Sequence, residues 1–412
     1  MVEHPKTAET DNTENRGLNA ISSLNETPRS ERLHIGFFGK TNSGKSSLIN
    51  ALAGQEIALV SPVHGTTTDP VYKAMELLPI GPVVLIDSAG LDDKSILGSL
   101  RVAKTKELLA KTDIAVLVVA STAANWQEEE KYLKEFSAYS IPVITVINDF
   151  GENNLPQPPV GLEPIILNAL EKEGIDRLKT KLIELSQAEI KEKTIAENLV
   201  KPDDLVLLVM PQDIQAPKGR LILPQVQTIR ALLDSHCTVI ISQTDELAKT
   251  LKLLKNPPNL VITDSQAFQE VYQVIGDTIP LTSFSLLMAC LKGDVEEFVE
   301  GAQAIASLKP HDRVLIAEAC THHALKNDIA REKIPALLEK KVGGKLEFTN
   351  WNGHNFPDDI QSYKLIIHCG ACMINSKNML YRQGLAKTHN VPITNFGVCL
   401  AYLSGILNKV VY

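Results

Sequence analysis

Three cysteines and two histidines follow two short apolar segments near the C-terminus: Cys320 and His322 after the first, and His368, Cys369 and Cys372 after the second. Residues 313–316 (RVLI) and 363–367 (YKLII) have the composition of buried strands. In open parallel sheets, ligands gather beyond the carboxyl ends of the strands. If these two strands are neighbours, the three thiols meet at one place. Soft sulfur ligands with histidines beside them predict a metal site.

The identity of the metal stays open on this composition. Three cysteines can hold three irons of a 4Fe–4S cluster and leave the fourth iron to a weaker or exchangeable ligand. Three cysteines and one histidine also close a tetrahedral zinc site. A Cys-x-x-Cys pair alone serves thiol–disulfide exchange as well, and buried cysteines often bind nothing. The residues therefore predict a metal, with an iron–sulfur cluster and zinc as the two main alternatives.

A second chemical motif lies at residues 39–46 (GKTNSGKS), between an apolar strand at 33–38 and a helix at 47–53. The spacing G-x-x-x-x-G-K-S in this context predicts a phosphate-binding loop. Its glycines allow successive backbone N–H groups to converge on phosphates, and the helix N-terminus adds partial positive charge. We expect Lys45 to reach the β- and γ-phosphates and the Ser46 hydroxyl to coordinate Mg²⁺.

Two downstream segments complete the expected nucleotide site. A buried strand at 83–86 ends in the pattern D-x-x-G, in which Asp87 would hold Mg²⁺ through water and the Gly90 amide would sense the γ-phosphate. Between the two motifs lies a polar loop, residues 64–70, whose Thr67 hydroxyl is in reach of the metal. Its placement fits a switch segment ordered by the γ-phosphate and Mg²⁺. A threonine-rich surface turn is the alternative reading of that loop.

The elements that must position these motifs form three α/β units. Strands at 114–119, 143–147 and 164–167, with helices between them, predict a doubly wound domain. Three strands and two helices then alternate from residue 205 to 263 without a cluster of titratable residues, which favours a scaffold or self-association domain. The expected divisions are a disordered N-terminal tail at 1–31, a P-loop domain at 32–190, a dimerisation domain at 200–275 and a metal-binding domain at 276–412. Both smaller units should have mainly parallel sheets.

Composition excludes several classes of protein. The 412 residues carry a net charge of −8, which argues against nucleic acid as a partner. A run of about 18 apolar residues, as a membrane span needs, is absent from the sequence. The N-terminus has no apolar signal segment, and six cysteines in so long a chain do not form a disulfide framework. We expect a soluble, cytoplasmic protein.

The ordered motifs resemble the translation-factor-like GTPases, in the branch with G-x-x-N-x-G-K-S and G-T-T. The resemblance implies a Mg²⁺-dependent GTPase in which Asn42 helps to hold a stimulating potassium ion, and in which Lys45, Asn42 and Gly90 take part in catalysis. Mg²⁺ would be held by Ser46, Thr67 and Asp87. The implied nucleotide-binding residues are Gly39, Asn42, Ser43, Gly44, Lys45, Ser46, Ser47, Thr67, Asp87, Gly90, Asn148, Asp149 and Ala169.

This chain departs from that branch at two places. Leu91 stands where many GTPases carry a water-orienting glutamine, so that turnover should be slow. The guanine-reading N-K-x-D motif is replaced by residues 148–151 (NDFG), in which Asn148 matches and the aspartate is absent. Ala169 matches the usual Ser-Ala-Lys loop. Guanine preference is weakened, and it would then rest on a neighbour such as Asp149 or Glu152.

The whole pattern, a P-loop GTPase domain, a middle domain without motifs and a terminal C-x-H…H-C-x-x-C, resembles the HydF family of maturation GTPases of the iron-only (di-iron) hydrogenases. The resemblance covers nearly the whole chain beyond the N-terminal tail. It implies a homodimeric scaffold with a 4Fe–4S cluster on Cys320, Cys369 and Cys372. His322 and His368 are candidates for the fourth ligand.

The same resemblance implies a cargo and partners. The family accepts a di-iron subcluster precursor made with radical-enzyme maturases and delivers it to apo di-iron hydrogenase. Two other classes stay open, a GTPase of ribosome or tRNA biogenesis and a nucleotide-switched zinc or iron–sulfur protein with another client.

Overall fold

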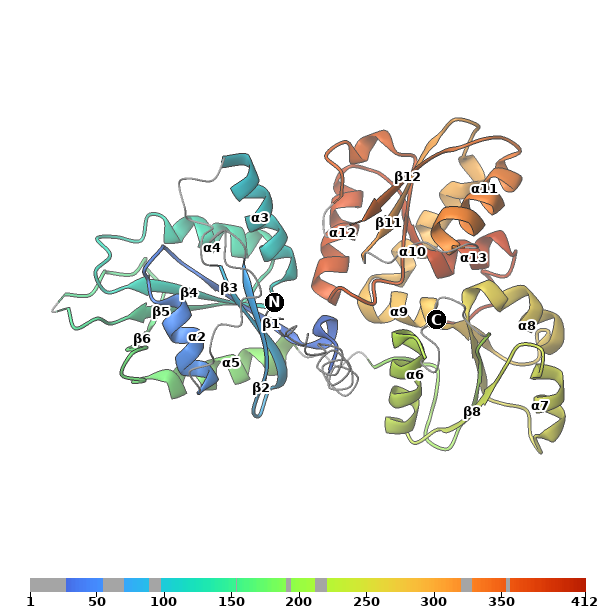
Figure 1. Cartoon of the computed structure of the whole chain (residues 1–412), viewed down its shortest axis with the longest axis horizontal. Helices are drawn as coiled ribbons and strands as arrows, with labels where there is room; N and C mark the ends of the chain where they lie inside the picture. The colour runs from blue at the N-terminus through green and yellow to red at the C-terminus, as the bar shows by residue number, and fades with distance from the viewer. Residues whose placement is uncertain are drawn as a thin grey trace, which may run out of the picture.

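The chain forms three α/β units, each built on its own sheet (Figure 1). The structure is a computed structural model that describes residues 27–54, 70–88, 98–152, 154–189, 194–211, 221–319, 328–352 and 356–412. The predicted class, a doubly wound P-loop domain followed by two smaller α/β units with mainly parallel sheets, is confirmed. Within these residues, every helix is too short or too polar to cross a bilayer.

The first unit is a six-stranded sheet in the order β2–β3–β1–β4–β5–β6, in which only β2 runs antiparallel to its neighbour. The strands are β1 (Leu33–Phe38), β2 (Val71–Leu77), β3 (Gly81–Asp87), β4 (Ile114–Ala120), β5 (Val143–Asn148) and β6 (Ile165–Leu167). The helices are α2 (Lys45–Ala53), α3 (Gly98–Lys111), α4 (Glu129–Ala138) and α5 (Ile175–Glu189). Apolar side chains of α2 and α5 pack on one face and those of α3 and α4 on the other.

The second unit is a four-stranded parallel sheet in the order β10–β9–β7–β8. The strands are β7 (Leu205–Val209), β8 (Thr238–Ser242), β9 (Leu260–Thr263) and β10 (Leu281–Ser283). The helices are α6 (Leu223–Asp234), α7 (Leu247–Leu253), α8 (Phe268–Ile275) and α9 (Phe284–Lys292). The unit extends beyond the expected boundary at 275, because β10 adds to the edge of the sheet and Phe284 of α9 packs into its core.

The third unit is also a four-stranded parallel sheet, in the order β12–β11–β13–β14. The strands are β11 (Arg313–Glu318), β12 (Glu347–Asn352), β13 (Leu365–His368) and β14 (Ile393–Asn395). The helices are α10 (Val295–Gln303), α11 (Ile334–Val342), α12 (Ser376–Thr388) and α13 (Phe396–Leu403). The two strands that precede the cysteines, β11 and β13, are neighbours, with Ala317 opposite His368.

Short helical turns connect several of these elements: η1 (Arg29–Glu31), η2 (Ser265–Ala267), η3 (Ala304–Ser307), the π-helical η4 (Ile329–Lys333) and η5 (Ile360–Ser362). The two smaller units share one apolar core, in which Val209 and Phe268 of the second belong to the same cluster as Leu315 and Ile366 of the third. The GTPase-like unit has its own cores and lies to one side of this pair (Figure 1).

The N-terminal segment differs from the expected disordered tail at its last residues. Residues 1–26 lie outside the described part of the chain, whereas residues 27–31 are placed, with Ser30 buried. The Arg32 guanidinium donates to the carbonyls of Thr27 at 2.9 Å and Met75 at 3.2 Å. The first bond closes the segment on itself and the second ties it to β2, whereas its polar composition suggested disorder.

Gly301 on α10 sets the distance between that helix and β14. A Cβ at Gly301 would lie 1.9 Å from the Ile393 carbonyl oxygen, which is backbone and cannot rotate away. We predict that Gly301→Ala lowers the free energy of unfolding by about 1–3 kcal/mol through overpacking. Gly384→Ala is the control, since Gly384 is on α12 with no atom within 4 Å of the added Cβ.

The measurement is the midpoint of thermal unfolding of the full chain. It should fall for Gly301→Ala and stay level or rise slightly for Gly384→Ala, because alanine favours helix over glycine by about 1 kcal/mol. Equal midpoints for the two variants would contradict the close packing of α10 on β14.

Candidate functional site

The loop at residues 39–46 joins β1 to α2 in a conformation that requires glycine at two positions. Gly39 has φ +140° and Gly44 φ +90°, which side chains rarely adopt. A Cβ at Gly39 would lie 2.1 Å from the Val118 carbonyl oxygen, and one at Gly44 would lie 2.0 Å from Asn148 Nδ2. Both P-loop positions therefore require glycine, because the backbone angle is unfavourable for other residues and a Cβ would clash with neighbouring atoms.

Lys45 and Ser43 line this loop with a cation and a hydroxyl. The Lys45 side chain is buried, and its Nζ donates to the carbonyls of Gly39 at 2.7 Å and Lys40 at 2.8 Å. The amine is thus held against the loop where the motif places phosphate groups. Ser43 Oγ is buried and has no hydrogen-bond partner among the described residues. A phosphate oxygen in the loop would satisfy that hydroxyl.

The two described Mg²⁺ candidates meet at the start of α2. Ser46 Oγ donates to Asp87 Oδ2 at 2.5 Å, which joins the P-loop to the end of β3. A hydroxyl and a carboxylate are hard oxygen ligands of the kind Mg²⁺ prefers. Ser47 follows in the first turn of α2. Thr67 and Gly90 lie outside the described residues, so their places in the site stay predictions.

Asn148 at the end of β5 connects the P-loop to the expected base-reading segment. Its Nδ2 donates to the Ser43 carbonyl at 3.1 Å, and its Oδ1 accepts from the Ala169 amide at 3.0 Å. The Asp149 carboxylate accepts from the Gly151 amide at 2.9 Å and so closes its own turn. The structure brings Asn148 and Ala169 together, and their part in nucleotide binding and the residue that reads the guanine base stay predictions.

Cys369 and Cys372 lie in the loop between β13 and α12. Cys369 Sγ accepts a hydrogen bond from the Ala319 amide at 3.2 Å, which ties this loop to the end of β11. Burial raises the pKa of the Cys369 thiol, whereas the amides of Ala319 and Ala371 and the Arg382 guanidinium oppose that rise. Cys320 follows Ala319 directly, but Cys320 and His322 lie outside the described residues. The part of the chain that the structure describes holds no cluster of three or more metal-ligating side chains.

His368 is fully buried beside Cys369 with both ring nitrogens engaged. Nδ1 lies 2.8 Å from the Cys369 carbonyl, to which it donates, and Nε2 contacts Arg382 Nη1. Burial and the Arg382 charge lower the pKa of His368 to about 3, so the ring is neutral. His368 could become a cluster ligand only after one of these contacts breaks.

Two buried cations flank the cysteine loop, and the sequence analysis missed both. Arg382 of α12 is fully buried, lies over the Phe356 ring at 5.2 Å and contacts His368. Lys292 at the end of α9 is buried and donates to the Ser30 carbonyl at 3.0 Å. The sequence spacing could have revealed Arg382, because it lies three positions after the apolar Met379 and therefore on the face of α12 that packs against the core.

Comparison with known families matches the three units separately. The model of a 50S ribosome-binding GTPase matches residues 34–149. The hydrogen maturase F dimerization domain matches residues 195–293, and the hydrogen maturase F tetramerization domain matches residues 296–412. The match to the dimerization domain thus ends after α9, in agreement with the packing of β10 and α9 on the second sheet.

Curated relatives resemble only the GTPase unit. The tRNA modification GTPase MnmE of Chromobacterium violaceum is 33% identical over 162 residues, which are 38% of this chain and 35% of the relative. The MnmE of Nitrosomonas europaea is 35% identical over 160 residues, which are 37% of this chain and 34% of the relative. The chain therefore spans about a third of the length of these curated relatives.

Solved structures resemble the chain at the level of fold alone. The crystal structure of a probable GTP-binding protein engB covers 38% of this chain and 99% of its own, at 21% identity and a TM-score of 0.29. The Era protein of Aquifex aeolicus bound to GDP.AlF4- covers 59% of this chain and 98% of its own, at 19% identity and a TM-score of 0.30.

The GTPase unit carries the phosphate loop and the Ser46–Asp87 pair that GTP and Mg²⁺ require, and its family model agrees with that chemistry. The other two units both match domains of one protein, and these two matches together span more than half of the chain. The chain belongs to the hydrogen maturase F (HydF) family and carries a GTPase domain.

Proposed function

We propose that this chain is a scaffold that hydrolyses GTP, binds a 4Fe–4S cluster through Cys320, Cys369 and Cys372, and delivers a di-iron subcluster precursor to apo di-iron hydrogenase. The observation that carries the proposal is the bond from the Ala319 amide to Cys369 Sγ at 3.2 Å. Ala319 is the chain neighbour of Cys320, so the two parts of the cysteine pattern approach each other at the ends of β11 and β13. The precursor itself, and the radical-enzyme maturases that supply it, follow from the family.

The donor set at the loop fits an iron–sulfur cluster. Cysteine binds metal as a thiolate, and amide N–H bonds to sulfur and nearby cations stabilise that anion and tune a cluster. Cys369 has two such amides and the Arg382 guanidinium. A cluster on three cysteines would supply one iron with an exchangeable coordination position, and a carrier needs such a position because cargo must arrive and leave. His322 and His368 are the candidates for that position.

The nucleotide part of the proposal assigns Mg²⁺ to Ser46, Asp87 and Thr67, and a stimulating potassium ion to the neighbourhood of Asn42. Asn42 has φ +64° at the tip of the P-loop, where it is exposed. Leu91 in place of a glutamine favours slow turnover. The proposed divisions are a GTPase domain at 32–190, a second unit for dimerisation that ends with α9, and a third unit that begins at α10 for the cluster.

Both hydrogen maturase F models describe self-association, so the chain forms oligomers. We assign dimerisation to the free side of β8. Within the described residues β8 bonds only to β7, and an unpaired strand edge readily accepts a strand from another chain. Ile241 on β8 is 53% exposed, and Val226 and Leu233 of the adjacent α6 are also exposed. This apolar edge is the surface that a second copy would cover.

Hydrolysis is predicted to depend on Lys45 and on potassium. Lys45→Ala should slow GTP hydrolysis by about 10²–10³-fold, as expected for a donor that stabilises transition-state charge. Lys40→Ala is the matched control, since Lys40 is an exposed lysine of the same loop, 3.6 Å from Glu129. Its rate should match that of the parent. Steady-state assays in potassium and in sodium complete the test, and equal rates in the two salts would contradict the role of Asn42.

Dimerisation through β8 is predicted to fail when a charge is placed on its free edge. Ile241→Asp should halve the molar mass of the oligomer that the full-length protein forms, as measured by light scattering. A dimer would become a monomer, or a tetramer would become dimers, because a carboxylate cannot be buried there without a partner. The control is Val274→Asp on α8, which changes an exposed valine of the same unit away from β8. An unchanged mass for Ile241→Asp would move the interface elsewhere.

Cluster binding is predicted to need each of the three cysteines. Cys320→Ser, Cys369→Ser and Cys372→Ser should each lose the cluster and the activation of apo-hydrogenase, because three thiolates are the minimum that holds it. His322→Ala and His368→Ala should keep a cluster and change its surroundings, since weak ligands tune a site more than they build it. Cys290→Ser is the control among the cysteines outside the loop.

The measurement is iron and zinc content, with electron paramagnetic resonance of each reduced variant purified without oxygen, followed by a maturation assay with apo-hydrogenase. A full cluster in any one cysteine variant would remove that residue from the site. A parent protein that holds zinc and no iron would refute the cluster, and loss of all iron in a histidine variant would refute the exchangeable position.

A further inference from the structure

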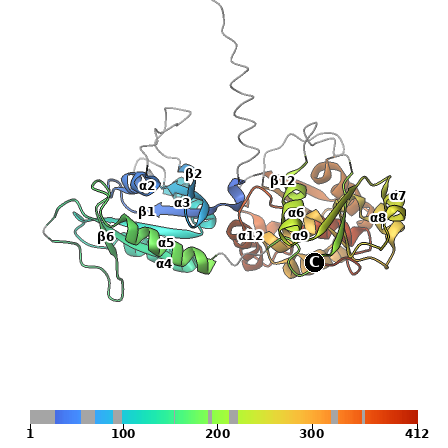
Figure 2. The same ribbon diagram turned by 90° about the horizontal axis from the view of Figure 1, so that it is seen from below.

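The cysteine loop is attached directly to the GTPase unit. Helix α12, which begins four residues after Cys372, lies against α3 at the boundary between the units, as both views show (Figures 1 and 2). Asn375 is buried at this contact. Its Nδ2 donates to the Lys111 carbonyl at the end of α3, at 2.9 Å. The same nitrogen lies 3.3 and 3.4 Å from the two carboxylate oxygens of Asp113.

Asn375 has a second task on the other side of its amide. Its Oδ1 accepts from the Asn378 amide at 3.1 Å and so caps the N-terminus of α12. One side chain therefore fixes both where α12 begins and where it meets α3. The two tasks use different atoms, and a variant can remove one without the other.

The segment that leads into β1 forms a second attachment. Ser30 Oγ donates to the Cys372 carbonyl at 2.7 Å, and the Ser30 carbonyl accepts from Lys292 Nζ at 3.0 Å. Asp113 in turn accepts from the His34 amide of β1 at 2.8 Å. The cysteine loop, the end of α3 and the start of β1 thus belong to one network of buried polar contacts, to which α9 contributes Lys292.

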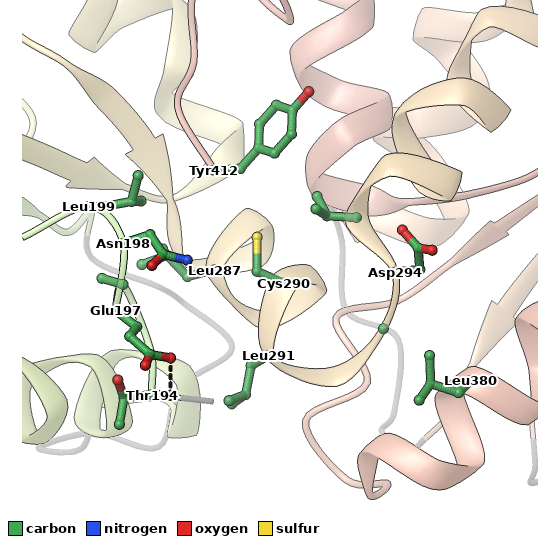
Figure 3. A pocket seen from close by; sticks show the side chains of 13 residues that line it. Thr194, Glu197, Asn198, Leu199, Leu287, Cys290, Leu291, Asp294, Leu380 and Tyr412 are labelled. Atoms are coloured by element: carbon green, nitrogen blue, oxygen red, sulfur yellow. Dashed lines mark hydrogen bonds between the residues drawn. The ribbon is translucent and has the colours of Figure 1, made fainter. Parts of the chain in front are cut away.

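More peripheral contacts fix the rotation of α12. The rings of Tyr139 and Tyr381 stack with centroids 5.2 Å apart, and Lys377 Nζ donates to the Ser140 carbonyl at 2.9 Å. By contrast, the linker into the second unit borders a cavity of about 510 Å³, between Glu197, Leu287 and Tyr412 (Figure 3). The contacts of α12 and of the Ser30 segment therefore contribute to the orientation of the GTPase unit.

Helix α3 can carry a displacement from the nucleotide to this contact. Among the described residues it is the first helix after the D-x-x-G motif, and that motif belongs to the region of a GTPase that the γ-phosphate orders and hydrolysis releases. Its 14 residues span roughly 21 Å at 1.5 Å per residue. Because a helix is stiff along its axis, movement at its first turn moves Lys111 at its last.

We propose that Asn375 is a positioning residue that transmits the nucleotide state from α3 to the Cys369–Cys372 loop. Binding of GTP in place of GDP shifts the end of α3, and the bond from Asn375 shifts the start of α12 and the exposure of Cys372 with it. The role of this coupling, which is to link GTP hydrolysis to the state of the cluster ligands, rests on the proposed function. The path from α3 through Asn375 to α12 follows from the observed contacts alone.

The test measures the alkylation rate of Cys372 by mass spectrometry in the full chain without metal, with saturating GDP and with a non-hydrolysable GTP analogue. We expect the two rates to differ roughly fivefold or more, the lower end of ordinary coupling between sites. Buried Cys237 is the internal reference and should react alike in both states. In Asn375→Asp the difference should vanish, while GTP hydrolysis keeps its parental rate.

The aspartate variant is chosen because it keeps the oxygen that caps α12. It removes the donor to Lys111 and sets a carboxylate against that of Asp113. The double variant Asp113→Asn/Asn375→Asp returns a donor to the contact from the other side, and the nucleotide dependence should return with it. A purely structural role of Asn375 would not give this rescue. Lys377→Ala, which removes a peripheral bond, should keep the dependence.

Equal rates of Cys372 in the two nucleotide states, or full dependence in Asn375→Asp, would overturn the inference. A chain that binds the cluster but shows equal rates would refute the coupling alone. A chain that shows the dependence but binds no cluster would support the coupling and refute the proposed function.

Discussion

Parallel pairing of strands is the constraint on which the functional sites depend, because the carboxyl ends of parallel strands share one edge of the sheet. In the GTPase unit, β1 and β3 are neighbours, and the P-loop and Asp87 follow them. In the third unit, β11 and β13 are neighbours, and Ala319 and Cys369 follow them. The pairing of the strands therefore brings together residues that are far apart in sequence, and side-chain contacts such as the Ser46–Asp87 hydrogen bond add to it.

The same constraint separates the two sites within the molecule. Asn375 contacts Lys111 and Asp113, which directly precede β4, so the cysteine loop meets the GTPase sheet at the amino ends of its strands. The P-loop lies at the opposite, carboxyl edge. A nucleotide cannot touch the cysteine loop in this arrangement, and any communication must pass along elements that cross the domain. Among the described elements, α3, β1 and β4 reach the contact with Asn375, and Tyr139 after α4 reaches Tyr381 of α12.

The surroundings of the cysteines combine a neutral histidine with buried positive charge. His368 is held by the Cys369 carbonyl and by Arg382, which makes it a support of the loop in this structure. Arg382 and Lys292 would stabilise a thiolate at Cys369 or Cys372, and burial makes such an interaction stronger than it would be in water. In the proposed carrier, these two cations would remain in place when the cargo leaves.

The sequence predicted the features that depend on local pattern. The P-loop was readable because its glycines, Lys45 and Ser46 lie within eight residues, and two apolar runs before the cysteines indicated β11 and β13, whose pairing comes from the structure. The boundary at 275 was wrong because β10 joins its sheet through a pairing that three residues of sequence do not reveal. Ser30, Asn375 and Arg382 escaped notice because their partners are non-local, as the bond between Ser30 and Cys372 illustrates. Cys320, His322, Thr67 and Gly90 lie outside the described residues, and their roles remain predictions.

Hydrogen–deuterium exchange of the wild-type chain tests most directly whether the nucleotide state reaches the cysteine loop. Peptides that cover residues 98–113 and 369–378 should both change their exchange rate when a GTP analogue replaces GDP, while peptides of β8 stay unchanged. A change confined to the P-loop and the residues around Asp87, with residues 369–378 exchanging alike in both states, would contradict the account.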